Sequence, residues 1–157
     1  MSKYIALFFL MIPGLLLAGW DIDQPAEKID GPLTGEIFGR KFELEEAKWS
    51  KSALTIASKK KMGSWPESQL MIFAKQDDGD EWVVKAGQKA NKTPHIHMKF
   101  GREGQTFPST LIFMEEYTMR LKLLKKTEKT ASFEIHVSLP DYKKSFLIGK
   151  FEAGITP

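Results

Sequence analysis

The stretch ASFEIHVSLPDYKKSFLIGKFEA, from Ala131 to Ala153, decides the fold of this chain. From Phe133 to Leu139 apolar residues alternate with polar ones, which is the two-residue period of a strand with one buried face. Pro140-Asp141 ends the run, because proline has no amide proton for a sheet ladder and aspartate caps turns. Alternation resumes from Leu147 to Ala153. The sequence therefore predicts two strands folded about one tight turn.

The composition limits the classes of protein to consider. A chain of 157 residues is long enough for one domain with its own core. It has no cysteine, which excludes a disulfide framework, a thiolate site and a lipid-modified cysteine. The positive charge is almost all lysine in short turn clusters such as Lys59-Lys60-Lys61, whereas nucleic-acid surfaces favour arginine. We therefore expect solvated loops and no nucleic-acid partner.

The N-terminus has the layout of a secretory signal peptide over residues 1–19. One lysine, Lys3, precedes an apolar run from Tyr4 to Leu17 and small residues at Ala18 and Gly19. An uncleaved anchor is the alternative, but the run is short for a span of about 20 residues. We expect an exported protein, periplasmic or extracellular, with no membrane span after cleavage. Residues 20–33 are polar and contain prolines and glycine, which predicts a flexible linker.

The remaining residues, 34–155, are predicted to form one β-domain. The predicted strands are Gly35–Leu44 and Ala53–Ser58, with a polar connection near Lys48–Lys51; the stretch 43–48 also fits a short helical turn. Gln69–Ala74 is apolar almost throughout, as in a central strand. Asp78-Gly79 then predicts a hairpin leading to Trp82–Val84, since both turn positions of such hairpins need positive φ.

Two further segments complete the strand pattern. Pro94–Phe100 places Ile96, Met98 and Phe100 on one face. Thr110–Lys125 fits either a helix or two strands joined near Glu115-Glu116, and the neighbouring strands favour the second interpretation. About seven to nine short strands predict a single antiparallel β-sandwich, immunoglobulin-like or jelly-roll-like.

Four short motifs resemble those of a known group of proteins. They are G-x-I-x-G-x-x-F at Gly35–Phe42, P-H-I-H at Pro94–His97, L-P-D-x-x-K-S at Leu139–Ser145 and G-x-F-x-A at Gly149–Ala153. In this order they resemble small exported bacterial β-sandwich domains of unassigned function. The resemblance covers nearly all of the chain after residue 19 and implies the fold and export, but no activity.

The three histidines of the chain, His95, His97 and His136, are the candidate metal ligands. Alternation places all three on the polar faces of their strands. Residues i and i+2 of a strand point the same way, so His95 and His97 could share one ion, and a third imidazole from an adjacent strand would complete a zinc or copper site. This hypothesis requires that the two strands be neighbours. The alternative is three separate solvent-facing side chains.

Other candidate sites are weaker. Met98 and Met114 with His97 and His136 superficially resemble the ligands of periplasmic copper carriers, but Met98 points to the opposite face from His97, and core packing is the alternative. His136, Asp141 and Ser145 suggest a catalytic triad, for which turn capping is the alternative. We expect Trp82 to lie in the core, and Trp65 could stack a sugar from a loop.

These observations predict a function only in general terms. No complete catalytic set is visible, since the chain lacks a G-x-S-x-G elbow and a cysteine nucleophile. We therefore expect a non-catalytic binding or interaction module of the bacterial envelope, whose partner is an envelope protein or a glycan. The alternative is a zinc- or copper-binding periplasmic protein built on the three histidines.

Overall fold

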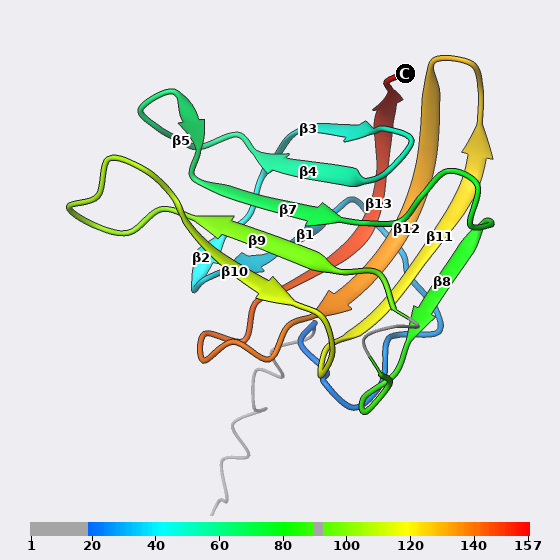
Figure 1. The fold of residues 1–157 in the computed structure, drawn as a ribbon, viewed down its shortest axis with the longest axis horizontal. Helices are drawn as coiled ribbons and strands as arrows, with labels where there is room; N and C mark the ends of the chain where they lie inside the picture. Colours follow the sequence, from blue (N-terminus) through cyan, green and yellow to red (C-terminus); the bar gives the residue numbers. More distant parts are fainter. Residues whose placement is uncertain (1–18, 90–92) are drawn as a thin grey trace, which may run out of the picture.

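The computed structural model describes residues 19–89 and 93–157, and in this part of the chain it contains strands and no helix (Figure 1). Eleven strands belong to one sheet and two form a separate hairpin. The strands are β1 (Thr34–Ile37), β2 (Arg40–Lys41), β3 (Leu44–Trp49), β4 (Leu54–Ser58), β5 (Lys61–Met62), β6 (Trp65–Pro66), β7 (Ser68–Ile72), β8 (Glu81–Val84), β9 (Ile96–Phe100), β10 (Ser109–Phe113), β11 (Thr118–Lys126), β12 (Thr130–Ser138) and β13 (Phe146–Ile155). The prediction of an all-β domain is confirmed. The predicted signal peptide lies almost wholly outside the described residues.

The large sheet is curled, with the strand order β10-β9-β7-β4-β3-β13-β12-β11-β8 and with β1 paired to β13 and β2. Its strand pairs are antiparallel except for β3 and β13, which run parallel where Trp49 faces Ile155. In Figure 1 the strands β4, β7 and β9 cross β11, β12 and β13 at a steep angle. The sequence predicts an antiparallel sandwich, whereas eleven of the described strands form one mixed sheet, because the parallel β3–β13 contact joins its two halves.

The core lies between the two halves of this sheet. Trp49 of β3 packs edge-on against Phe133 of β12, with ring centroids 4.9 Å apart, and against Trp82 of β8, at 6.4 Å. Strands β13, β12 and β11 lie between β3 and β8 in the sheet order, so the contact of Trp49 with Trp82 shows that the sheet curls back on itself. Each buried side chain of this size contributes about 1.5–3 kcal/mol.

Strands β12 and β13 form the antiparallel pair that the sequence predicts. Phe133 faces Phe151 and Val137 faces Leu147, and the core face of each strand is buried. Asp141 caps the turn: its carboxylate accepts hydrogen bonds from the backbone N–H of Ser145 at 2.9 Å and from the Ser145 hydroxyl at 3.0 Å. The turn-capping interpretation of these two residues is therefore confirmed.

Two connections predicted from the sequence differ in the structure. The stretch 44–49, expected to be a polar connection or helical turn, is strand β3, because Ala47 and Trp49 alternate with exposed Glu46 and Lys48 and face the core. The hairpin predicted at Asp78-Gly79 is not formed. Strand β7 pairs with β4 and β9, while β8 pairs with β11, so this loop crosses from one half of the sheet to the other.

The ambiguous stretch from Thr110 to Lys125 contains two strands, as predicted. Strand β10 pairs with β9, and β11 pairs with β12 and β8, so the two strands are consecutive in the chain but not in the sheet. Glu116, in the connection predicted near Glu115-Glu116, has a φ of 63°. The connection therefore turns the chain between the two halves of the sheet.

The segment predicted as a flexible linker is docked on the sheet instead. Residues 20–33 pack on the outer side of β11, β12 and β13, and the side chain of Ile29 is buried. Backbone hydrogen bonds join it to Lys150, whose N–H donates to Gly31 at 2.9 Å and whose carbonyl accepts from Leu33 at 3.0 Å. A Cβ at position 149 would lie 2.4 Å from the Pro32 carbonyl oxygen, so this close approach requires Gly149.

Candidate functional site

The three histidines lie on two strands that are not neighbours. His95 precedes β9 and His97 lies within it, and β9 pairs with β7 and β10. His136 lies in β12, which pairs with β11 and β13. The pairing that a shared three-histidine site requires is therefore not observed. Within residues 19–89 and 93–157, no group of three or more His, Asp or Glu side chains is placed to hold a metal ion.

His136 is occupied by the N-terminal segment. It is buried, with 3% of its surface exposed. Its Nδ1 accepts a hydrogen bond from the backbone N–H of Ala26 at 2.6 Å, and its Nε2 lies against the Gly19 carbonyl, to which it donates. A backbone carbonyl can only accept a hydrogen bond, so Nε2 must carry the proton. Both ring nitrogens therefore hold the segment 19–26 on the outer face of β12. These contacts explain why a polar side chain on the outer face of β12 is buried.

The weaker candidate sites are also separated. Met98 is fully buried on the core face of β9, while Met114 is 46% exposed, so these two methionines do not join one ligand set with His97. His97 instead packs against the Phe73 ring, with centroids 4.8 Å apart. Asp141 and Ser145 bond to each other in the turn and His136 bonds elsewhere, so no triad is assembled.

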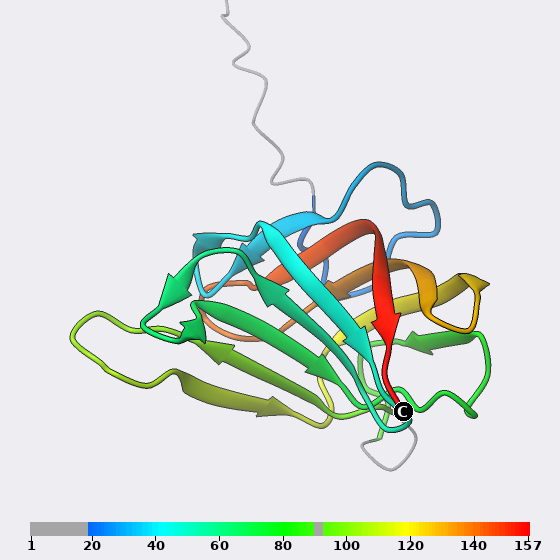
Figure 2. The same ribbon diagram turned by 90° about the horizontal axis from the view of Figure 1, so that it is seen from above.

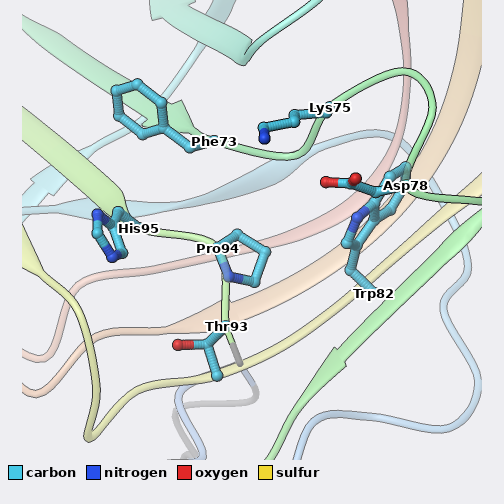
Figure 3. Close-up of a pocket in the computed structure, with 7 residues that line it drawn as sticks. All are labelled: Phe73, Lys75, Asp78, Trp82, Thr93, Pro94 and His95. Carbon is cyan, nitrogen blue, oxygen red and sulfur yellow. The ribbon is translucent and has the colours of Figure 1, made fainter. Parts of the chain in front are cut away.

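A pocket of about 630 Å³ lies where the two halves of the sheet separate, beyond the end of β7. Figure 3 shows Phe73 and His95 on one side of it, Asp78 and Trp82 on the other, and Pro94 between them. Three segments form its wall: the chain after β7, the loop before β8 together with Trp82 of β8 itself, and the chain before β9. The lining residues are Phe73, Lys75, Asp78, Trp82, Thr93, Pro94 and His95.

The lining combines apolar faces with groups of both charges. Phe73, Pro94 and Trp82 supply apolar surface. Lys75 is a cationic donor and Asp78 an anionic acceptor, and the His95 imidazole serves as either. A concave site with apolar walls and a few polar groups is the usual form of a small-molecule binding site.

The indole of Trp82 is the unusual element of this wall. The residue is 8% exposed, and its Nε1 is buried without a hydrogen-bond partner among the described residues. Buried polar groups in folded proteins are almost always hydrogen-bonded, and exceptions mark places where an acceptor is missing. The sequence correctly predicts that Trp82 is buried, but only the fold shows that its N–H lacks an acceptor beside a pocket.

Tyr117, a fully buried residue that directly precedes β11, anchors the segment 93–94 of the pocket wall. Its hydroxyl donates to the Pro94 carbonyl, and the Thr93 hydroxyl donates to the Met114 carbonyl at 2.8 Å. Burial raises the pKa of Tyr117 from its ordinary value of 10.0 to about 12, and a hydrogen bond with Thr93 partly opposes this shift. The phenol therefore stays neutral and fixes the segment 93–94 as a hydrogen-bond donor.

Sequence reasoning identifies only part of this pocket. It singles out His95 and the turn residue Asp78, but assigns them to a metal site and to a hairpin. Phe73 and Lys75 carry no signal, because nothing local shows that the chain after β7 meets the chain before β9. The backbone N–H of Phe73, which bonds to the His95 carbonyl at 2.9 Å, makes that contact.

Comparisons with known proteins add no assignment. No helix in the described parts of the chain is long and apolar enough to cross a membrane. The resemblance to small exported β-sandwich domains stays a prediction, since no model of a protein family, no curated protein and no solved structure matches the chain.

Proposed function

We propose that this protein is a non-catalytic binding module of the bacterial envelope, and that it binds a saccharide in the pocket beside Trp82. The observation that carries the proposal is the buried Trp82 N–H at the edge of the pocket, which has no acceptor among residues 19–89 and 93–157. Leaving such a donor unpaired costs about 1–3 kcal/mol. A ligand oxygen that accepts this hydrogen bond recovers that free energy, so the pocket favours a ligand rich in acceptor oxygens.

The other lining groups support a saccharide. Sugar hydroxyls both donate and accept, so they pair with Asp78 as well as with Lys75. The C–H face of a sugar ring packs against aromatic and proline surface, which Phe73 and Pro94 provide. A purely anionic ligand would be repelled by Asp78, and a purely apolar one would leave Lys75 and Asp78 without partners.

The proposed compartment rests on the sequence. Residues 1–19 predict export, and an exported bacterial domain meets the glycans of the cell envelope. The proposed frame is sandwich-like, with two halves of one sheet facing each other and the pocket at their open edge. A zinc or copper function has less support, because His95 borders the pocket whereas His136 lies in β12, which does not pair with β9.

The indole N–H signals in a ¹H–¹⁵N NMR spectrum test this proposal directly. The chain has four tryptophans, and Trp82→Phe identifies the Trp82 signal by its loss while keeping an aromatic ring. The probes are N-acetylglucosamine, its linear trimer and glucuronic acid. We expect one of these to shift the Trp82 indole proton downfield, with weaker binding in Lys75→Met and Asp78→Ala.

Trp65→Phe is the matched control, because Trp65 lies on the β5–β6 hairpin, away from the pocket. Its loss should leave saccharide binding unchanged. A Trp82 signal that none of the probes moves would refute the saccharide proposal. Breakdown of a probe during the titration would show an enzyme instead of a binding module.

A further inference from the structure

Four loops gather at the end of the domain opposite the pocket. They are residues 38–43, 59–67, 101–107 and 141–145, and we call them together the basic end. Figures 1 and 2 both show β2, the β5–β6 hairpin, the loop after β9 and the turn after β12 at this end. Strand β9 begins beside His95 of the pocket and finishes at Phe100, next to the loop 101–107.

Direct contacts make the basic end one surface. The Phe38 ring stacks on Phe100, with centroids 3.8 Å apart, and meets Tyr142 edge-on at 5.1 Å. The Arg102 guanidinium lies over both phenylalanine rings, at 5.6 and 5.3 Å from their centroids. A neighbouring pocket brings Arg40 and Lys60 together around Glu67, each 3.1 Å from its carboxylate. Loops from four parts of the chain are thus fixed relative to one another.

The net positive charge of the protein is concentrated at the basic end. Its four loops hold eight lysines and arginines and four acidic residues, a net charge of +4, whereas the whole chain has +3. The rest of the chain is therefore slightly negative. Three of the four carboxylates have partners within the surface: Glu67 pairs with Arg40 and Lys60, Glu43 pairs with Lys41, and Asp141 caps its turn. The outward field of this end is accordingly positive.

Exposed aromatic side chains accompany these charges. Trp65 is 42% exposed, Phe107 68% and Tyr142 74%, each on a different loop of the basic end. Large exposed apolar groups close to one another mark an interaction site more often than isolated ones do. Phe107 is informative, because its ring has no polar group and gains nothing from a polar partner.

We propose that the basic end docks the protein on the surface of an anionic lipid bilayer. Lysines near such a surface are attracted to its negative potential. Tryptophan and tyrosine favour the level of the headgroups, and an exposed phenylalanine such as Phe107 can enter the acyl boundary. Charge complementarity thus comes with side chains suited to each depth of the interface.

A nucleic acid fits the same surface less well. Six of the eight cations are lysine, and the two arginines are already engaged, Arg40 with Glu67 and Arg102 over the Phe38 and Phe100 rings. Nucleic-acid sites rely on arginine forks directed at phosphates and bases. The pocket lies at the other end of β9, so docking on lipid leaves it open. This inference does not depend on the saccharide proposal.

Vesicle flotation with the full chain tests the inference. The probes are phosphatidylcholine vesicles with and without phosphatidylglycerol. The apolar composition of Tyr4–Leu17 predicts some binding to both kinds of vesicle, so the measured quantity is the ratio of the two affinities. We expect a clear preference for the anionic vesicles. Each lysine of the basic end that is neutralised should lower this preference about fivefold.

The charge variant is Lys59→Gln/Lys61→Gln/Lys143→Gln, which should reduce the preference by on the order of a hundredfold. Its control, Lys51→Gln/Lys125→Gln/Lys129→Gln, removes the same charge from exposed positions away from the basic end and should change little. Phe107→Ser should weaken binding to anionic vesicles while leaving the melting temperature unchanged. Melting curves of all variants confirm that they fold.

Three results would overturn the inference. One is equal binding to the two kinds of vesicle. Another is an equal loss of preference in the control triple variant, which would show an effect of net charge alone. The third is tight binding to a single-stranded DNA oligonucleotide, lost in the charge variant, without any preference for anionic vesicles; that result would assign the surface to nucleic acid.

Discussion

The ionisation of Tyr117 gives the sharpest prediction from the structure. The side chain is fully buried, and burial raises the pKa of its phenol to about 12. In the unfolded chain the phenol has its ordinary pKa of about 10. Between these two values the unfolded chain loses the proton while the folded chain keeps it. Stability is therefore complete below pH 10 and falls as the pH rises from 10 to 12.

The size of the effect follows from the two pKa values. At pH 11 the unfolded phenol is mostly ionised and the folded one mostly neutral. The free energy of unfolding should therefore be about 1.4 kcal/mol lower at pH 11 than at pH 8 from this group alone. The Tyr117→Phe variant lacks this contribution. It should cost about 1 kcal/mol at pH 8, because the hydrogen bond to the Pro94 carbonyl is lost.

The assay is urea unfolding at pH 8 and pH 11, followed by far-UV circular dichroism, since tyrosinate quenches tryptophan fluorescence. Lysines also titrate in this range, but they do so equally in wild type and variant. The comparison is therefore the pH-dependent difference between Tyr117→Phe and wild type. Tyr142→Phe is the control, because Tyr142 is 74% exposed and its loss should leave the wild-type pH dependence intact.

The reasoning fails if Tyr117→Phe loses as much stability between pH 8 and pH 11 as wild type does. That result would mean that the buried phenol ionises as easily as a free one. An unchanged stability of Tyr117→Phe at pH 8 would separately show that the bond to Pro94 contributes nothing.

Three other substitutions test the core, the turn and the histidines. Trp49→Ala should destabilise the domain by about 3–5 kcal/mol, because the indole fills the core between the sheet halves and donates to the Ala74 carbonyl. The control Trp65→Ala should cost less than about 1 kcal/mol, since Trp65 is 42% exposed, and thermal melts of the two variants make the comparison. Asp141→Ala should cost about 2 kcal/mol by removing acceptors from Ser145 in the turn, and the exposed Asp77→Ala should be neutral in urea unfolding. His136→Ala should leave the affinity of the protein for zinc and copper, measured by calorimetry, unchanged, because both ring nitrogens of His136 already have partners. A tenfold weaker affinity in this variant would support the three-histidine hypothesis.

The sites show where sequence reasoning stops. Alternation correctly places His97 on the outer face of β9, but also suggests that His136 is solvent-facing. Instead, the N-terminal segment 19–26 covers His136 and takes both its nitrogens. Two lysine clusters, Lys59–Lys61 and Lys143–Lys144, are expected to be separate solvated turns, but both belong to loops of the basic end. In each case the deciding contact joins segments far apart in the chain, and no local pattern encodes it.

The sequence by itself determines the local elements of this protein. It predicts strands β12 and β13 and their turn, because alternation, a proline and a capping aspartate all lie within 23 consecutive residues. It also predicts the buried face of β9 and the division of 110–125 into two strands. Only the tertiary structure decides which strands pair, as for β7 and β8, and that β3 closes the sheet against β13. The reason is physical: strand propensity and turn chemistry act over a few residues, whereas pairing depends on which apolar faces bury one another best once the whole sheet has curled.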